Sequence, residues 1–128
     1  KFVKKNKNSK YYISLGRKKY YSCIKFSDVV IGNSSSGIIE VPSFKKPTLN
    51  LGIRQNGRIQ SKSVLNCNQI TEKKLYNLIK KSLSLKIKSI SKKAKNPFEK
   101  KNTSNQVIKI LKKIVKVRDN QKIFFDLK

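Results

Sequence analysis

Three consecutive serines, Ser34, Ser35 and Ser36, are followed by Gly37 and, one helical turn further on, by Glu40. Hydroxyl groups and unpaired backbone N–H groups at the start of a helix are hydrogen-bond donors that suit a phosphate or a diphosphate. A glycine lets the backbone approach such a ligand closely. Taken alone, however, the serine run is more typical of an ordinary helix cap than of a phosphate site.

Glu40 strengthens the functional interpretation, because the chain has only six acidic residues. A carboxylate near a helix N-terminus stabilises the helix by about 0.3–1 kcal/mol, which is a sufficient structural reason for its presence. The alternative is that Glu40 accepts hydrogen bonds from the two hydroxyls of a ribose, while the diphosphate lies on the serines. Phosphate donors and a ribose acceptor one turn apart are the groups that a nucleotide-sugar requires.

Short apolar segments alternate with amphipathic segments around this motif. Strands are expected over residues 28–32, 47–52 and 63–67, and helices over residues 16–26, 35–44, 71–84 and 105–117. This alternation predicts an α/β fold with a parallel sheet. Because the first strand leads into the serines, they should lie at the carboxyl edge of the sheet, where open parallel sheets bind ligands. Residues 53–62 are expected to form a polar, flexible loop.

The charge balance raises a second class of function. The net charge is +26 over 128 residues, the length of one domain. Such a charge is compatible with a nucleic-acid-binding protein. However, 28 of the 32 basic residues are Lys and four are Arg, and Arg is the residue that forks onto phosphates and guanines. The lysines are also spread along the whole chain, so we favour a solvated lysine coat that reflects A/T-rich codons. Such a coat still attracts anionic small molecules.

The ends and the cysteines give further expectations. The chain begins at Lys1 and has no Met, so we interpret it as a piece of a longer protein that lacks its N-terminal part. No apolar run approaches the roughly 20 residues that span a bilayer, and no membrane partner is expected. Cys23 and Cys67 are expected to be buried, reduced thiols, which favours a cytoplasmic protein.

One long segment carries a resemblance to a known family. Residues 14–58 read SLGRKKYYSCIKFSDVVIGNSSSGIIEVPSFKKPTLNLGIRQNGR, and they resemble the C-terminal half of hydrolysing UDP-N-acetylglucosamine 2-epimerases. These enzymes serve the synthesis of sialic and related nonulosonic acids. The resemblance is dense over residues 14–67 and resumes at NPF, residues 96–98. The related non-hydrolysing enzymes have a glycine-richer corner, so the triple serine favours the hydrolysing branch.

The resemblance implies a fold and a set of binding residues. The fold is the C-terminal, Rossmann-like half of a glycosyltransferase-B architecture, with residues 1–128 as a single, partial UDP-binding domain. The implied contacts to the diphosphate are Ser34, Ser35, Ser36 and Gly37. Glu40 is implied to contact the ribose. Tyr20 falls where an aromatic ring stacks near the uracil, although a tyrosine of the hydrophobic core is an equally good interpretation.

The loop after the second strand matches a further motif of the family. Arg54, Gln55 and Arg58 correspond to its RQ-x-G-R pattern beside the sugar and the phosphates, with plain solvent exposure as the alternative. Two departures stand out. Ile53 replaces the usual Asp before this pattern, and NPFEKK at residues 96–101 lacks the two glycines of the family's turn. The turn should still form, because the Asn-Pro pair remains.

The implied reaction removes the proton at C2 of the sugar with anti loss of UDP, and then adds water to give N-acetylmannosamine. Such a reaction needs a general base and assistance to the leaving diphosphate. The chain has no His. None of the carboxylates other than Glu40 lies in a site-like context; they are Asp28, Glu72, Glu99, Asp119 and Asp126. We therefore expect no catalytic residue, metal or cofactor here, and weak UDP binding without turnover.

The expected partners are a UDP-sugar and the missing N-terminal domain, with a homodimeric parent enzyme left open. Two other functions stay open at this point. A glycosyltransferase-B sugar transferase would share the diphosphate corner but would transfer the sugar to an acceptor. A basic nucleic-acid-binding module would bind arbitrary DNA with a steep salt dependence and without competition by UDP. Tyr11, Tyr12, Tyr20 and Tyr21 are only a weak sign of the stacking that such a module needs.

Overall fold

A three-stranded parallel sheet lies at the centre of the protein, for which the computed structural model describes residues 1–114. The strands are β1 (Val30–Gly32), β2 (Thr48–Leu51) and β3 (Val64–Cys67), in the order β1-β2-β3. Both pairings are parallel, and Gly32, Asn50 and Asn66 stand side by side across the sheet. The three strands expected from the sequence and their parallel arrangement are confirmed.

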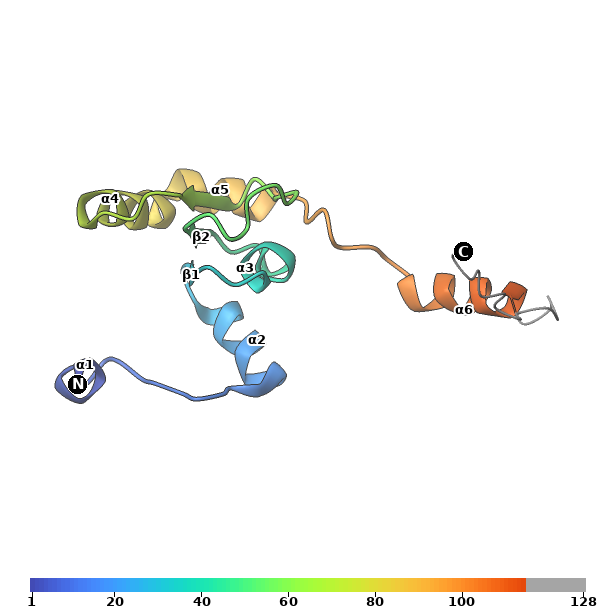
Figure 1. Cartoon of the computed structure of the whole chain (residues 1–128), viewed down its shortest axis with the longest axis horizontal. Coiled ribbons are helices and arrows are strands. Elements are labelled where there is room, and N and C mark those ends of the chain that lie inside the picture. Colours follow the sequence, from blue (N-terminus) through green and yellow to red (C-terminus); the bar gives the residue numbers. More distant parts are fainter. Residues whose placement is uncertain (115–128) are drawn as a thin grey trace, which may run out of the picture.

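Helices flank the sheet on both sides (Figure 1). The helices of the described residues are α1 (Phe2–Lys5), α2 (Gly16–Phe26), α3 (Ser36–Ile39), the 3-10 helix η1 (Val41–Phe44), α4 (Glu72–Leu83), α5 (Leu85–Lys93) and α6 (Thr103–Ile114). Of these, α1 and α6 lie away from the sheet in Figure 1. In Figure 1, α4 and α5 lie on one side of the strands, and α2 and α3 lie on the other. This arrangement confirms the α/β fold with a Rossmann-like parallel sheet.

The most deeply buried apolar side chains belong to α3, which follows the serine motif, and to neighbouring elements. Ile24 of α2, Ile38 of α3, Val41 of η1 and Leu49 of β2 are at most 2% exposed. They come from the four elements that surround the turn between β1 and α3. Because interiors of this kind are packed as densely as crystals, the position of that turn is fixed by the core beneath it.

The helix expected over residues 35–44 is wrong as a single element. It is divided at Glu40 into α3 and η1, each of four residues. The cause is Pro42, which has no N–H to donate to the carbonyl of Ile38 and whose ring would clash with that carbonyl in a continuous helix. Glu40 therefore stands at a junction between two short helices.

The remaining helices agree with the sequence in part. Helix α2 has the expected bounds, and α4 begins after Thr71, whose side chain accepts a hydrogen bond from the N–H of Lys74. Helix α5 was not anticipated. Helix α6 begins two residues earlier than expected. Its expected last residues, 115–117, lie outside the described residues, and so do Arg118, Asp119, Asp126 and the Phe pair of the tail.

One of the two cysteines differs from the expectation. Both thiols are free, but Cys23 is exposed and only Cys67 is buried. On α2 the buried position is Ile24, and successive residues of a helix point about 100° apart, so Cys23 faces solvent. No helix among residues 1–114 is long and apolar enough to cross a membrane.

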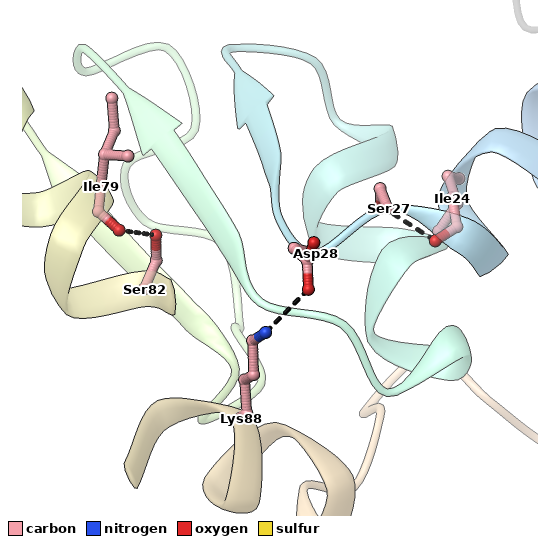
Figure 2. A network of polar contacts seen from close by, with 6 residues as sticks. All are labelled: Ile24, Ser27, Asp28, Ile79, Ser82 and Lys88. Atoms are coloured by element: carbon pink, nitrogen blue, oxygen red, sulfur yellow. Dashed lines mark hydrogen bonds and ion pairs between the residues drawn. The ribbon is translucent and has the colours of Figure 1, made fainter. Parts of the chain in front are cut away.

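An ion pair joins the two sides of the sheet at its amino edge. Figure 2 shows Lys88 of α5 reaching Asp28, next to Ser27, which ends α2. The Lys88 Nζ lies 2.7 Å from Asp28 Oδ1 and lowers the pKa of that carboxyl. The side chains are 38% and 70% exposed, so this pair is a solvated link and not part of a functional site.

Candidate functional site

The serine motif forms the corner between β1 and α3 at the carboxyl edge of the sheet, as expected. Ser35 is the N-cap of α3, and its side chain makes no capping hydrogen bond. The N–H of Gly37 donates to the carbonyl of Ser34 at 3.1 Å, and the N–H of Ser36 donates to the Ser34 hydroxyl at 3.3 Å. Within residues 1–114, no protein acceptor takes the backbone N–H of Ser34 or Ser35. The corner therefore presents unpaired donors at its tip.

Glu40 is joined to this corner by a chain of hydroxyl groups. The Ser36 hydroxyl donates to Glu40 Oε2 at 2.5 Å, and the Tyr20 hydroxyl lies 2.5 Å from the Ser36 oxygen. Because serine has a single hydroxyl hydrogen and gives it to the carboxylate, Tyr20 is the donor to Ser36. The chain Tyr20–Ser36–Glu40 thus runs in one direction and ends on the carboxylate of Glu40.

The second oxygen of Glu40 has a different donor. The Tyr21 hydroxyl donates to Glu40 Oε1 at 3.1 Å. The Tyr21 ring has two aromatic neighbours, with its centroid 5.3 Å from that of Phe44 and 6.0 Å from that of Tyr20. The hydrogen bond to Glu40, followed by burial, raises the pKa of Tyr21, so its hydroxyl stays protonated and remains a donor.

A cleft of about 450 Å³ opens beside this network. It is lined by Tyr12, Ile13, Ser14, Leu15, Gly16, Arg17, Tyr20, Tyr21 and Glu40. Its volume is within the range of small-molecule sites, and its lining combines aromatic rings with one carboxylate and one guanidinium. Such a lining suits a planar ring attached to a hydroxyl-bearing sugar. Sequence reasoning singled out Tyr20 and Glu40 here but missed Tyr12 and Tyr21, which only the packing brings together.

Gly37 has a packing role in the structure. It is buried, and a Cβ at this position would lie 2.8 Å from the Thr48 methyl carbon of β2. The Thr48 hydroxyl donates to the carbonyl of Gly37 at 2.7 Å. The glycine is therefore required because α3 packs closely on β2, which is a different reason from approach to a ligand.

Plain solvent exposure, the alternative to a binding role for the loop after β2, is wrong for Gln55. It is 2% exposed, and its Nε2 donates to the carbonyl of Asn33 at 2.8 Å. Its Oε1 is buried without a hydrogen-bond partner among the described residues. The side chain holds the loop after β2 against the residue that precedes Ser34. Arg54 and Arg58, on either side of this anchor, are exposed.

Asn96 makes hydrogen bonds to residues on both sides of the junction at Glu40. Its Nδ2 donates to the carbonyl of Ile39 at 2.8 Å and to the Ser43 hydroxyl at 2.7 Å. The N–H of Glu99 donates to the carbonyl of Asn96 at 3.2 Å, so the turn expected at the Asn-Pro pair is confirmed despite the missing glycines. The sequence marked this residue as part of a turn, but its contact with α3 and η1 could not be read from it.

The described residues offer no alternative centre of metal chemistry. Among residues 1–114, no cluster of three or more His, Cys, Asp or Glu side chains comes together in a way that could bind a metal ion. The features that remain are the unpaired N–H groups, the hydroxyl chain and the aromatic cleft.

Comparison with known proteins decides the family. Residues 1–112 match the family described as UDP-N-acetylglucosamine 2-epimerase. The chain belongs to this family. It is 35% identical to the polysialic acid biosynthesis protein P7 of Escherichia coli over 128 residues, which are 99% of this chain and 32% of that protein. The resemblance seen in the sequence is thereby confirmed.

Two further relatives of this epimerase-family chain carry more specific names. The GDP/UDP-N,N'-diacetylbacillosamine 2-epimerase (hydrolyzing) of Campylobacter jejuni subsp. jejuni is 44% identical over 62 residues, 48% of this chain and 16% of that protein. The UDP-N,N'-diacetylbacillosamine 2-epimerase (hydrolyzing) of Legionella pneumophila is 49% identical over 51 residues, 40% of this chain and 14% of that protein. The chain spans about a third of the length of the E. coli relative.

Proposed function

We propose that this chain is the UDP-binding part of a hydrolysing 2-epimerase, the C-terminal half of a glycosyltransferase-B fold. The substrate would be UDP-N-acetylglucosamine or a diacetamido relative, and the product a 2-epimeric sugar plus UDP. Two relatives with hydrolysing names support the reaction type, and the E. coli relative supports a role in sialic or nonulosonic acid synthesis. The observation that carries the proposal is the hydroxyl chain that joins the serine corner to Glu40 beside an aromatic cleft.

The diphosphate would bind at the tip of the corner. Ser34 and Ser35 contribute unpaired N–H groups and hydroxyls, while Ser36 and Gly37 hold the turn in place. Because α3 has only four residues, its dipole is small, and the local donors supply most of the attraction. Exposed arginines beside the Gln55 anchor, Arg54 and Arg58, would neutralise the phosphates.

The nucleoside would occupy the cleft. Glu40 would accept hydrogen bonds from the ribose hydroxyls, since each carboxylate oxygen keeps a lone pair beyond the one used by Ser36 or Tyr21. The ring of Tyr20 lines the same cleft and would contact the uracil. Phosphates at the serines and ribose at Glu40 then lie one helical turn apart, which matches the order of groups in UDP.

The chemistry would come from elsewhere in the enzyme. Loss of the C2 proton requires a general base, and departure of UDP builds negative charge that the corner's donors stabilise. Outside the corner, Asp28 pairs with Lys88, and Glu99 accepts from Ser43, so neither lies in the cleft. We infer that the base and acid belong to an N-terminal domain outside residues 1–128. This chain would bind UDP without turning over the sugar.

Calorimetric titration with UDP tests this proposal. Glu40→Ala removes a charged acceptor, and Ser35→Ala removes a donor at the tip. Since hydrogen bonds to charged groups contribute about 1.5–3 kcal/mol, we expect Kd to rise at least about tenfold in Glu40→Ala and less in Ser35→Ala. Glu72→Ala, at the start of α4, is the matched control and should leave Kd unchanged. Wild-type affinity in both corner variants would contradict the assignment.

The reaction itself needs a separate measurement. The enzyme that contains this chain should release free N-acetylmannosamine, or its diacetamido counterpart, together with UDP. Transfer of the sugar to an acceptor would instead identify a transferase. The isolated 128-residue chain should give neither product, because Glu40, the described carboxylate that lines the cleft, is assigned to the ribose and not to the C2 proton.

A further inference from the structure

The two oxygens of Glu40 are each held by a different protein hydroxyl. Ser36 donates to Oε2 and Tyr21 donates to Oε1. The terminal torsion of a free glutamate is broad, so an unheld carboxylate rotates readily about its last bond. With both oxygens fixed, the plane of the carboxylate is set, and the one remaining lone pair of each oxygen points in a defined direction.

A carboxylate with two fixed acceptor directions suits two neighbouring hydroxyl groups. We propose that Tyr21 is a positioning residue that makes the site selective for ribose over 2′-deoxyribose. This inference rests on the proposed function, because it assumes that Glu40 accepts from the ribose of UDP. Tyr21 would act through Glu40, so that the 2′- and 3′-hydroxyls each find an oxygen already aimed at them.

The position of the Tyr21 hydroxyl is itself fixed by packing. Its ring neighbours those of Tyr20 and Phe44, at centroid distances of 6.0 and 5.3 Å. Phe44 belongs to η1, which begins directly after Glu40, so the ring is anchored to the same junction as the carboxylate. The hydroxyl is also kept protonated, because the hydrogen bond to Glu40 raises the pKa of Tyr21.

Tyr20 and Tyr21 differ in their place in this network. Tyr20 donates to the hydroxyl of Ser36 and reaches the carboxylate only through it, whereas Tyr21 contacts Glu40 directly. Removing the Tyr21 hydroxyl therefore frees one carboxylate oxygen and leaves the serine corner intact. Removing it as Tyr21→Phe also keeps the ring and its two aromatic contacts.

The test is a comparison of UDP with 2′-deoxy-UDP by calorimetry on the 128-residue chain. The wild type should bind UDP at least about tenfold more tightly, because deoxy-UDP lacks one hydrogen bond to a charged acceptor. Tyr21→Phe should reduce this ratio at least threefold with an unchanged thermal midpoint. Tyr76→Phe, an exposed tyrosine on α4, is the control and should keep the wild-type ratio. In a Glu40→Gln background, Tyr21→Phe should have no further effect on the ratio.

The outcomes separate the two proposals. If the wild type binds both nucleotides equally, Glu40 does not read the ribose and the proposed function fails at this point. If the wild type discriminates and Tyr21→Phe keeps the full ratio, the inference is overturned and the proposed function stands. Loss of folding in Tyr21→Phe would equally contradict the inference, since the hydroxyl would then serve stability and not selectivity.

Discussion

Replacement of Gly37 by Ala perturbs the contact between α3 and β2 at a defined point. The new Cβ would lie 2.8 Å from the Thr48 methyl carbon, whereas ordinary contacts of this kind begin at 3.4 Å. Thr48 cannot simply rotate away, because its hydroxyl donates to the carbonyl of Gly37 at 2.7 Å. Both residues are buried, so α3 or β2 must shift.

The size of the effect follows from two opposing contributions. Overpacking a well-packed core costs about 1–3 kcal/mol, whereas Gly→Ala stabilises by about 0.4–1 kcal/mol through the unfolded chain. We therefore expect Gly37→Ala to lower the free energy of unfolding by about 1–2 kcal/mol. Because Ser34–Ser36 lie at the start of the same turn of helix, UDP binding should weaken as well.

Urea denaturation of a double-mutant cycle measures this contact. Thr48→Ser removes the obstructing methyl and keeps the hydroxyl, so Gly37→Ala should be relieved by about 1–2 kcal/mol in its presence. Thr48→Val keeps a methyl and removes the hydroxyl, so it should give no relief. Additive effects of Gly37→Ala and Thr48→Ser would refute the view that packing dictates the glycine.

The remaining predictions concern the supports around the site. Asn96→Ala removes two hydrogen bonds to the Glu40 junction and should cost about 1–3 kcal/mol of unfolding free energy, measured in urea, whereas a change below 0.5 kcal/mol would contradict its supporting role. Lys88 holds the pKa of Asp28 below its ordinary value of about 4 in the folded protein. Asp28→Asn should therefore lower the free energy of unfolding near neutral pH. The difference from wild type should vanish as the pH falls through the folded-state pKa of Asp28. A difference that persists below that pKa would contradict this. A thiol reagent should modify Cys23 rapidly and Cys67 only on unfolding, and equal rates would show that the burial is misassigned.

The strands and the serine corner were predictable because their signals are local. A β-branched apolar run followed by small polar residues specifies a strand and a turn with little help from the rest of the chain. The burial on both faces that such a run also predicts is wrong for β1, because this strand lies at the edge of the described sheet and Ile31 is 42% exposed. Thr71 marked the start of α4 in the same way. Pro42 lies inside the helix expected over residues 35–44, and its effect is to divide that helix at Glu40.

Helix α5 was missed because its pattern misleads. Leu85 and Ile87 alternate with Lys86 and Lys88, which imitates the period of a strand. Ser84 ends α4 and also caps α5, with its hydroxyl accepting from the N–H of Ile87, so no loop separates the two helices. Because Ser84 is both the C-cap of α4 and the N-cap of α5, no loop of distinct composition marks the end of one helix and the start of the next.

The missed parts of the site depend on tertiary contacts. The burial of Gln55 follows from its bond to Asn33, 22 residues away, in a segment whose composition predicts an exposed loop. The placement of Tyr21 on Glu40 requires α2 to pack against η1, which no local pattern specifies. Sequence reasoning therefore located the corner and its carboxylate, and the structure added the groups that hold them.

The central claim is that the diphosphate of UDP binds at the tip of the serine corner. Amide chemical shifts recorded by NMR during a UDP titration of the isotope-labelled chain test it most directly. We predict the largest shifts at the N–H groups of Ser34 and Ser35, which have no protein acceptor, with smaller shifts at Gly37 and Glu40. Shifts spread over the lysine-rich surfaces of α4 and α5, with Ser34 and Ser35 unmoved, would contradict the account.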